Sequence, residues 1–319
     1  MKHILLKIAL FFSLLAIPFM TLFISPYPEE FAYHYIEHDC YNHGAWIYDR
    51  ICHNSTPIDI AFIGSSHTIH SYQDKKIEEI IGINYHVANL GYCRYGRNLE
   101  YTLLRMLLEH KTPKFIVIEV HEDEEKNSHD IFPYLAKTND LLMTPTAFDR
   151  DYFADLFHGA SARLEYFKAR FIFRKKYPKS SSELYGYGTS DRKVTGEELK
   201  DNQNAWRKRL EQTQLQAIEK IQMKYPTAYL EKMIGLIKEK NIPFLFVYLP
   251  EYGSKLKSPK YASYYQNIAP LLIPPQYIFD DASNWMDASH FNDKGSGLIS
   301  EWMAEQLKTE LCIDRFKPN

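Results

Sequence analysis

Short apolar runs typical of strands alternate with helical segments at both ends of the chain, and this alternation constrains the fold more than any other feature. The predicted strands cover Ile58–Ile63, residues 84–88, Lys114–Val120, Pro243–Leu249 and Tyr277–Phe279, and the predicted helices cover residues 72–81, 97–110, 227–240 and 294–310. Leu99, Leu103 and Leu107 recur at helical spacing, whereas Lys114–Val120 is a continuous apolar run typical of a strand buried on both faces. The pattern predicts an α/β domain of three layers, α/β/α, around a central parallel sheet.

The alternation of strands and helices is lost between about residue 125 and residue 225, where charged and aromatic residues mix. This stretch is interpreted as a helical insertion that could cover the pocket of the domain. It contains a basic run from Lys168 to Lys179 that includes Phe171 and Phe173. Such a run is typical of a solvated helix face or of a site that binds phosphate or an anionic polymer. The predicted organisation is therefore an anchor over residues 1–26, a juxtamembrane segment over 27–56, and the α/β domain over 57–319.

The N-terminus has a short basic flank followed by an apolar run over residues 8–24 that contains no charged residue. A membrane-spanning helix needs roughly 17–25 residues, and the core of a cleaved secretory signal only about 7–15. The run favours an uncleaved signal anchor over a cleaved signal peptide or a buried core helix. Because the basic flank stays in the cytoplasm, the prediction places the rest of the chain on the outer side of the inner or plasma membrane.

Charge and cysteine content narrow the classes of function. The chain has 38 basic and 40 acidic residues and a formal charge of -2, so nothing favours binding to nucleic acid. Of the cysteines, Cys40 and Cys52 are close enough in sequence to close a short disulfide loop in an oxidising compartment. Because there is no Cys-x-x-Cys pair, and His67 and His70 have no carboxylate or thiol ligands at matching spacing, no metal or diffusible cofactor is predicted.

Two segments far apart in sequence carry the groups that nucleophilic acyl chemistry needs. Ser66 follows the glycine that ends the first predicted strand, and Asp287 and His290 share one loop before the last predicted helix. A serine hydroxyl is a weak nucleophile until a histidine takes its proton and a carboxylate orients that histidine. We therefore predict Ser66 as nucleophile, His290 as base and Asp287 as the group that orients it. The alternative is a purely structural role, with a common turn at Ser66 and a helix-capping loop at residues 287–293.

An oxyanion site is predicted at the same edge of the sheet. The N–H of Ser66 would open a helix, and Gly91 follows the second predicted strand, so both N–H groups could face a developing negative charge. The side chain of Asn89 is a further candidate donor.

These residues resemble the blocks of the SGNH (GDSL-like) hydrolases and their membrane-anchored acyltransferase relatives. Gly64-Ser65-Ser66 stands where the family has Gly-Asp-Ser, and Asp287-Ala-Ser-His290 where it has Asp-x-x-His. The resemblance covers residues of roughly 57–125 and 240–310. It implies acyl-ester hydrolysis or transfer, with an acylated glycan or polymer of the cell envelope as substrate.

The chain departs from the family in its third block. Ile118-Glu-Val-His-Glu-Asp123 spans the end of the third predicted strand, where the family carries Gly-x-Asn-Asp, so the oxyanion asparagine is missing from its usual place. Loss of one such donor typically costs about 100- to 1,000-fold in rate. The alternative function is therefore a catalytically inactive member that binds glycan or assists a membrane-embedded acyltransferase.

Overall fold

The computed structural model describes residues 2–35, 40–82, 84–143, 149–174, 180–211, 216–254 and 256–311. In this part of the chain, five parallel strands form one sheet in the order β2-β1-β3-β4-β5. The strands are β1 (Ile60–Ile63), β2 (Val87–Asn89), β3 (Phe115–Val120), β4 (Phe244–Tyr248) and β5 (Leu271–Leu272). The predicted α/β architecture with a parallel sheet is thus confirmed.

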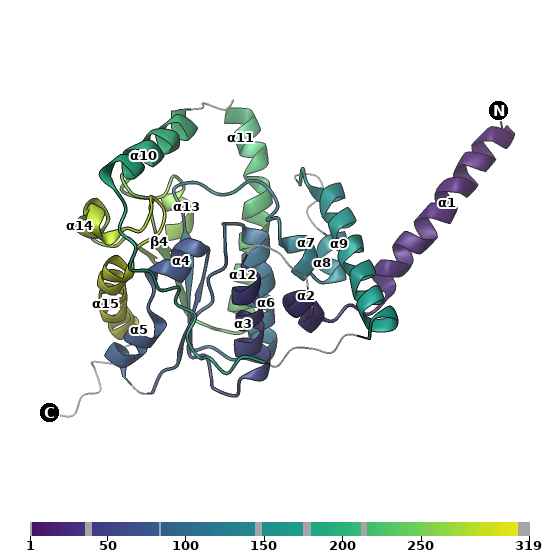
Figure 1. Cartoon of the computed structure of the whole chain (residues 1–319). Coiled ribbons are helices and arrows are strands. Elements are labelled where there is room, and N and C mark those ends of the chain that lie inside the picture. The colour runs from purple at the N-terminus through teal and green to yellow at the C-terminus, as the bar shows by residue number, and fades with distance from the viewer. Residues whose placement is uncertain are drawn as a thin grey trace.

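Helices cover both faces of this sheet because the strand side chains alternate between two cores (Figure 1). Ala61 and Ile63 face the core under α6 (Arg97–His110) and α12 (Lys224–Glu239). Ile60 and Phe62 face the opposite core, which includes side chains of α5 (Asp74–Ile81) and α15 (Asp293–Glu310). β1 therefore has apolar side chains at every position, as a strand buried on both faces requires.

One predicted strand is wrong. Residues 277–279 lie in the helix α14 (Gln276–Asp280), and the edge strand β5 lies a few residues earlier. A short apolar run fits a buried helix as well as a strand, and periodicity alone does not separate them. Pro275 at the N-cap favours the helix, because proline has the backbone angle that the start of a helix needs.

The segment before the sheet packs onto the domain. It forms α2 (Glu29–Tyr35), α3 (Tyr41–Tyr48) and the π-helical turn η1 (Asp49–His53), and Tyr33, Ile47 and Ile51 of this segment are buried in the core on the α6 side. The preceding helix α1 (Lys2–Ile24) extends away from the domain (Figure 1). Among the described residues, no helix combines the length and the apolarity needed to cross a membrane.

The predicted insertion contains several helices, and its described residues 180–195 between two of them form neither helix nor strand. It contains α7 (Phe132–Leu135), α8 (Thr138–Leu142), α9 (Tyr152–Phe167), the π-helical turn η2 (Lys168–Ile172), α10 (Gly196–Glu211) and α11 (Gln216–Gln222). Residues 175–179, the end of the basic run, lie outside the described part of the chain. The short elements α4 (Ser66–Ser71), α13 (Ala262–Gln266) and η3 (Ala282–Asn284) complete the order.

Candidate functional site

Ser66 lies at the carboxyl end of β1, where the order of the sheet changes direction. β2 lies on one side of β1 and β3 on the other, and the loops that leave β1 and β3 therefore separate at this point. Ser66 is the first residue of α4, with Ser65 as its N-cap, and it is half-buried. The nucleophile position is thus held by a rigid strand end and remains accessible from outside.

Gly64 makes this turn possible because the position has no room for a side chain. A Cβ at this position would lie 2.3 Å from both Oε2 of Glu119 and Oγ1 of Thr68. The carboxylate of Glu119 therefore packs directly against the backbone of Gly64, and any larger residue would have to displace it.

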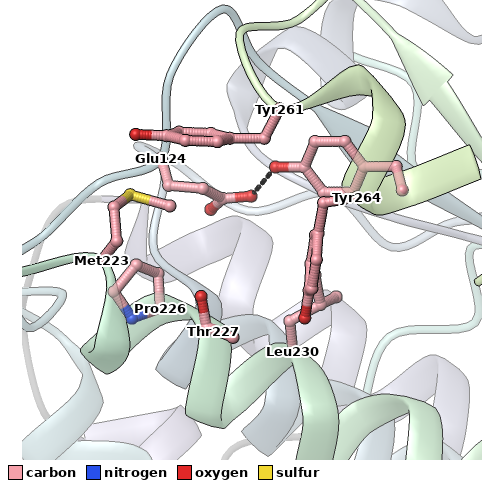
Figure 2. A pocket seen from close by; sticks show the side chains of 8 residues that line it. Glu124, Met223, Pro226, Thr227, Leu230, Tyr261 and Tyr264 are labelled. Atoms are coloured by element: carbon pink, nitrogen blue, oxygen red, sulfur yellow. Dashed lines mark hydrogen bonds between the residues drawn. The ribbon is translucent and has the colours of Figure 1, made fainter. Parts of the chain in front are cut away.

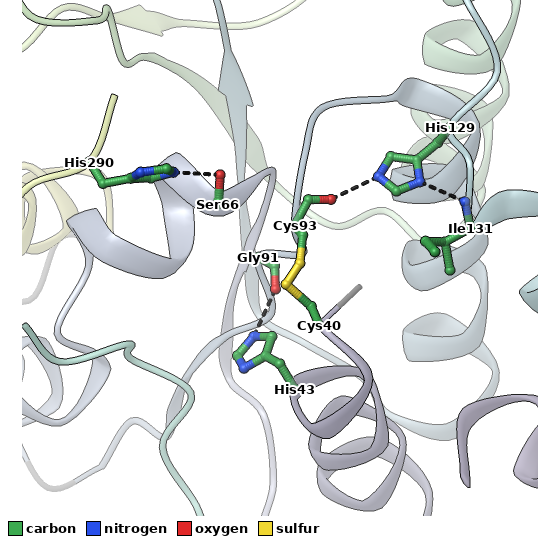
Figure 3. Close-up of a disulfide and its surroundings, with 8 residues drawn as sticks. All are labelled: Cys40, His43, Ser66, Gly91, Cys93, His129, Ile131 and His290. Carbon is green, nitrogen blue, oxygen red and sulfur yellow. Dashed lines mark hydrogen bonds between the residues drawn. A yellow bond between two sulfur atoms is a disulfide. The ribbon is translucent and has the colours of Figure 1, made fainter. Parts of the chain in front are cut away.

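The structure brings the three predicted side chains together. Nε2 of His290 lies 2.7 Å from Oγ of Ser66 (Figure 3). Nδ1 of the same ring lies 3.0 and 2.9 Å from the two carboxylate oxygens of Asp287. Each distance is within hydrogen-bonding reach, so the serine, the histidine and the carboxylate form one continuous chain across residues 224 positions apart.

The Asp-x-x-His loop holds its own geometry. Oδ1 of Asp287 accepts backbone hydrogen bonds from Ser289 and His290, both at 2.8 Å, which closes the loop into a tight turn. Burial alone would raise the pKa of Asp287, but the hydrogen bonds and the charge interaction with His290, together with the backbone N–H groups, lower it to about 2. The carboxylate is therefore ionised at neutral pH and can stabilise an imidazolium at His290.

Glu119, at the end of β3, anchors the turn from below. The fully buried carboxylate accepts hydrogen bonds from N and Oγ of Ser65, at 2.8 and 2.7 Å, and from N of Thr68 at 3.0 Å, and Oγ1 of Thr68 also donates to it. Burial alone would raise the pKa of Glu119, but the adjacent His121 and these donors lower it. The end of β3 thus carries a charged group that fixes the backbone on either side of Ser66.

His121 completes an ion pair with Glu119. Its Nε2 also lies 3.1 Å from Oγ of Ser65. Burial alone would lower the pKa of His121, but the Glu119 carboxylate outweighs it and raises the pKa. The sequence placed these residues at a strand end, and only the structure reveals that they contact the serine turn.

Two further histidines surround the triad. The ring of His67 lies 4.4 Å from that of His121 and 5.6 Å from that of His290, between centroids. Burial and the neighbouring histidine lower the pKa of His67 to about 3, so this ring is neutral. His70 lies 5.1 Å from the ring of His290 and bonds through Nδ1 to the carbonyl of Gly188, 2.8 Å away.

Two of the predicted oxyanion donors have other partners. Nδ2 of Asn89 donates to the carbonyls of Thr68, Ile69 and Tyr72, so the side chain caps the end of α4. The prediction of Asn89 as an oxyanion donor is wrong, because this amide is buried and committed to those carbonyls. The N–H of Gly91 is directed at Oδ1 of Asn89, 3.2 Å away.

The N–H of Ser66 has a different environment. The N–H groups of Ser65 and Thr68 donate to the carboxylate of Glu119, and the N–H of His67 donates to Oγ of Ser65, whereas no described residue accepts from the N–H of Ser66. This group stays the predicted donor nearest to the serine oxygen.

A disulfide braces the loop after β2. Cys40 pairs with Cys93, with a Cα–Cα distance of 6.0 Å (Figure 3). Cys52 has a free thiol. The closer partner in sequence is not used, because Cys52 lies on η1 and packs against the core on the α6 side. Nε2 of His43 bonds to the carbonyl of Gly91 at 2.9 Å, so α3 and the Gly91 loop are held together twice.

The three groups His67, Glu119 and His121 have potential ligand atoms within 4.8 Å of one another. Two imidazoles and a carboxylate could hold a transition metal ion. However, both oxygens of Glu119 already accept hydrogen bonds from the serine turn, so a metal would have to displace at least the Ser65 hydroxyl. Glu119 and His121 thus already satisfy each other as an ion pair, and the chemistry of the serine turn needs no metal.

A largely apolar pocket of about 210 Å³ lies beyond the carboxyl ends of β3 and β4 (Figure 2). Its walls are Met223, Pro226, Thr227, Leu230, Tyr261, Tyr264 and Tyr265, with Glu124 at its inner side. The Tyr95 hydroxyl bonds to Glu124 at 2.8 Å, and the Tyr95 ring lies 4.1 Å from the ring of His121. Tyr95 and His121 thus form a line of contacts from Glu124 to the serine turn.

Comparison of the chain with protein-family models and with curated proteins returns no match. The site is therefore interpreted from its own geometry.

Proposed function

We propose that the protein is a serine esterase or O-acyltransferase of the SGNH type. The observation that supports this proposal most strongly is the hydrogen-bonded chain from Ser66 through His290 to Asp287, with 2.7 Å between the serine oxygen and the imidazole. The position of the half-buried Ser66 at the edge of the sheet supports it as well, because a reacting acyl group must reach the hydroxyl.

The proposed reaction has two steps. Oγ of Ser66 attacks the carbonyl carbon of an acyl ester while Nε2 of His290 takes the hydroxyl proton, and Asp287 stabilises the imidazolium that forms. The N–H of Ser66 donates to the oxyanion. His290 then protonates the departing alcohol, which leaves an acyl-serine. Water or a sugar hydroxyl attacks this ester in the second step, again with His290 as base, and the serine is regenerated.

The proposed substrate is an acylated glycan or polymer of the cell envelope. This part rests on the family resemblance and on the predicted anchor over residues 8–24, which would hold the site outside the inner or plasma membrane. The pocket beside Glu124 could receive an apolar part of such a ligand, since its lining is largely aromatic and aliphatic. The chemistry described needs no metal or diffusible cofactor.

The alternative is a member that binds glycan or assists a membrane-embedded acyltransferase without turnover. It is favoured by the oxyanion site, where Asn89 and the N–H of Gly91 bond to other groups of the protein. A site with a complete proton relay and a reduced oxyanion hole would react slowly, so chemical labelling is a sharper test than turnover.

The test is labelling of the full-length protein with a fluorophosphonate probe, which modifies an activated serine. We expect labelling of the wild type, loss of labelling in Ser66→Ala, and normal labelling in Ser289→Ala. Ser289 lies on the Asp287 loop and contributes its backbone N–H there, so it is a matched control for the same chemical change. Equal labelling of Ser66→Ala and wild type, or no labelling of either, would overturn the proposal and favour the noncatalytic alternative.

A further inference from the structure

An apolar stripe runs along α9 and η2, on the side of the molecule near α1. Five of its side chains lie on one face of the helical segment and are exposed: Phe153, Phe157, Leu164, Phe167 and Phe171. Their spacing of four, seven, three and four residues keeps them within one narrow face of a helix. Ile172 and Phe173 extend the exposed apolar surface at its end.

The opposite face of α9 packs against the domain, so the stripe faces outward. Asp155, Ala162 and Arg163 are buried against the domain, and the guanidinium of Arg163 donates to the carbonyl of Gly159 and to Oγ1 of Thr138. The exposed aromatic face is thus a fixed feature of the fold and is not produced by a loosely packed helix.

The stripe is continuous with the apolar surface of α1. Phe23, near the end of α1, is buried in a cluster with Ala160 of α9, and Leu156 of α9 packs against the same cluster. The guanidinium of Arg163 lies 4.9 Å from the centre of the Phe23 ring. Exposed apolar side chains continue along α1 through Ile24, Met20, Ile17, Leu14, Phe11, Leu10, Leu6, Leu5 and Ile4. The two helices meet at the base of α1 (Figure 1).

Basic side chains accompany the end of the stripe. Arg170 and Arg174 are both exposed and flank Phe171 and Phe173. Exposed aromatic rings next to exposed guanidinium groups suit the interface of a bilayer, where rings enter the acyl region and cations meet anionic headgroups.

We infer that the α9–η2 stripe lies on a lipid bilayer, with its phenylalanine rings in the acyl region and Arg170 and Arg174 against anionic headgroups. The occupant is lipid and not a second copy of the chain, because α9 packs against the end of α1, which carries further exposed apolar side chains along its length, and because Arg170 and Arg174 lie at the end of the stripe. The contact would fix the orientation of the domain on the membrane. The inference does not depend on the chemistry of Ser66.

The test places an environment-sensitive fluorophore on the stripe in the full-length chain. Cys52→Ser and Cys312→Ser remove the other thiols and leave the Cys40–Cys93 disulfide intact. Single variants Phe157→Cys and Phe171→Cys are labelled with nitrobenzoxadiazole, and Lys240→Cys, exposed at the end of α12, is the matched control. The proteins are reconstituted into vesicles of equal parts phosphatidylcholine and phosphatidylglycerol, with and without a quencher on the acyl chains.

We expect a blue shift and loss of most of the emission at positions 157 and 171 with the lipid quencher, and no loss at position 240. Quenching at 157 and 171 no stronger than at 240 would overturn the inference. Shielding of these two positions from aqueous iodide without quenching by lipid would also overturn it, because it would indicate a protein partner.

A second arm tests the headgroup contact. The double variant Arg170→Glu and Arg174→Glu should reduce lipid quenching at position 157 in the anionic vesicles and leave it unchanged in pure phosphatidylcholine. An unchanged signal in the anionic vesicles would refute the role of these two cations. Circular dichroism of each labelled protein checks that its fold is retained.

Discussion

Replacing Glu119 by glutamine tests whether a single buried carboxylate holds the serine turn. The amide oxygen of Glu119→Gln can take the place of Oε2 and keep the three bonds from Ser65 N, Thr68 N and Thr68 Oγ1. A hydrogen bond to a charged group contributes about 1.5–3 kcal/mol and a neutral one about 0.5–1.5, so each retained bond weakens by about 1 kcal/mol. The lowered pKa of Glu119 indicates that His121, together with the other donors to this carboxylate, outweighs the cost of burying its charge. We therefore expect a loss of about 3 kcal/mol in the free energy of unfolding.

Urea unfolding at neutral pH, followed by circular dichroism, measures this loss. Glu305→Gln is the control, because Glu305 is 61% exposed and forms only a surface ion pair with Lys308. Such a pair contributes about 0–1 kcal/mol, so the control should be close to the wild type. If the free energy of unfolding of Glu119→Gln lies within about 1 kcal/mol of the wild type, as is expected for the control, the reasoning on the turn is refuted.

The same pair of proteins gives a pH test. A carboxylate whose folded pKa lies below its ordinary value of about 4.3 stabilises the protein above that value, and the contribution is lost as the pH falls through the lower folded pKa. The stability gap between the wild type and Glu119→Gln should therefore be full at neutral pH and shrink on acidification below pH of about 4. A gap that widens in acid would contradict the assignment of Glu119 as an ionised acceptor.

Three further predictions concern the disulfide, the triad and the strand end. Cys40→Ala should lower the free energy of unfolding by about 4 kcal/mol in non-reducing urea titrations, since the bridge spans 53 residues, and an unchanged midpoint would contradict this. Asp287→Asn should lower ester turnover by about 10⁴-fold without unfolding the protein, because the asparagine would hold His290 in the wrong tautomer. A loss of less than about tenfold would argue against the relay. Gly64→Ala should destabilise by about 1–3 kcal/mol in thermal unfolding, whereas Gly235→Ala, where nothing lies within 4 Å of an added Cβ, should stabilise by about 0.5–1 kcal/mol; equal effects would refute the packing argument.

Much of the architecture could be predicted because its signals are local. The helix predicted at residues 97–110 is α6 with the same bounds, and β3 begins one residue inside the predicted Lys114–Val120. Leucines at helical spacing and a continuous apolar run each contain their own evidence for an element. The run at 277–279 was ambiguous for the same reason, since three residues are too few to establish a period.

The candidate triad was predictable because each half carries its chemistry within a few residues. Asp287 and His290 form their contact inside one turn, so their spacing alone indicates it. Ser66 is placed by the end of a strand, and parallel strands bring their carboxyl ends to one edge. The distance of 2.7 Å between Ser66 and His290 follows from this topology, although no sequence argument gives its value.

The amino-acid order by itself determined four of the five described strands, the main helices and which residue types reach the edge of the sheet, because side-chain periodicity and turn chemistry act over short stretches of chain. Only the tertiary structure decided that Glu119 bonds to the serine turn, that Asn89 caps α4, and that Cys93 takes Cys40 in place of Cys52. Each of these contacts depends on how separate elements pack, and a buried carboxylate, amide or thiol takes whichever partners that packing brings within bonding distance.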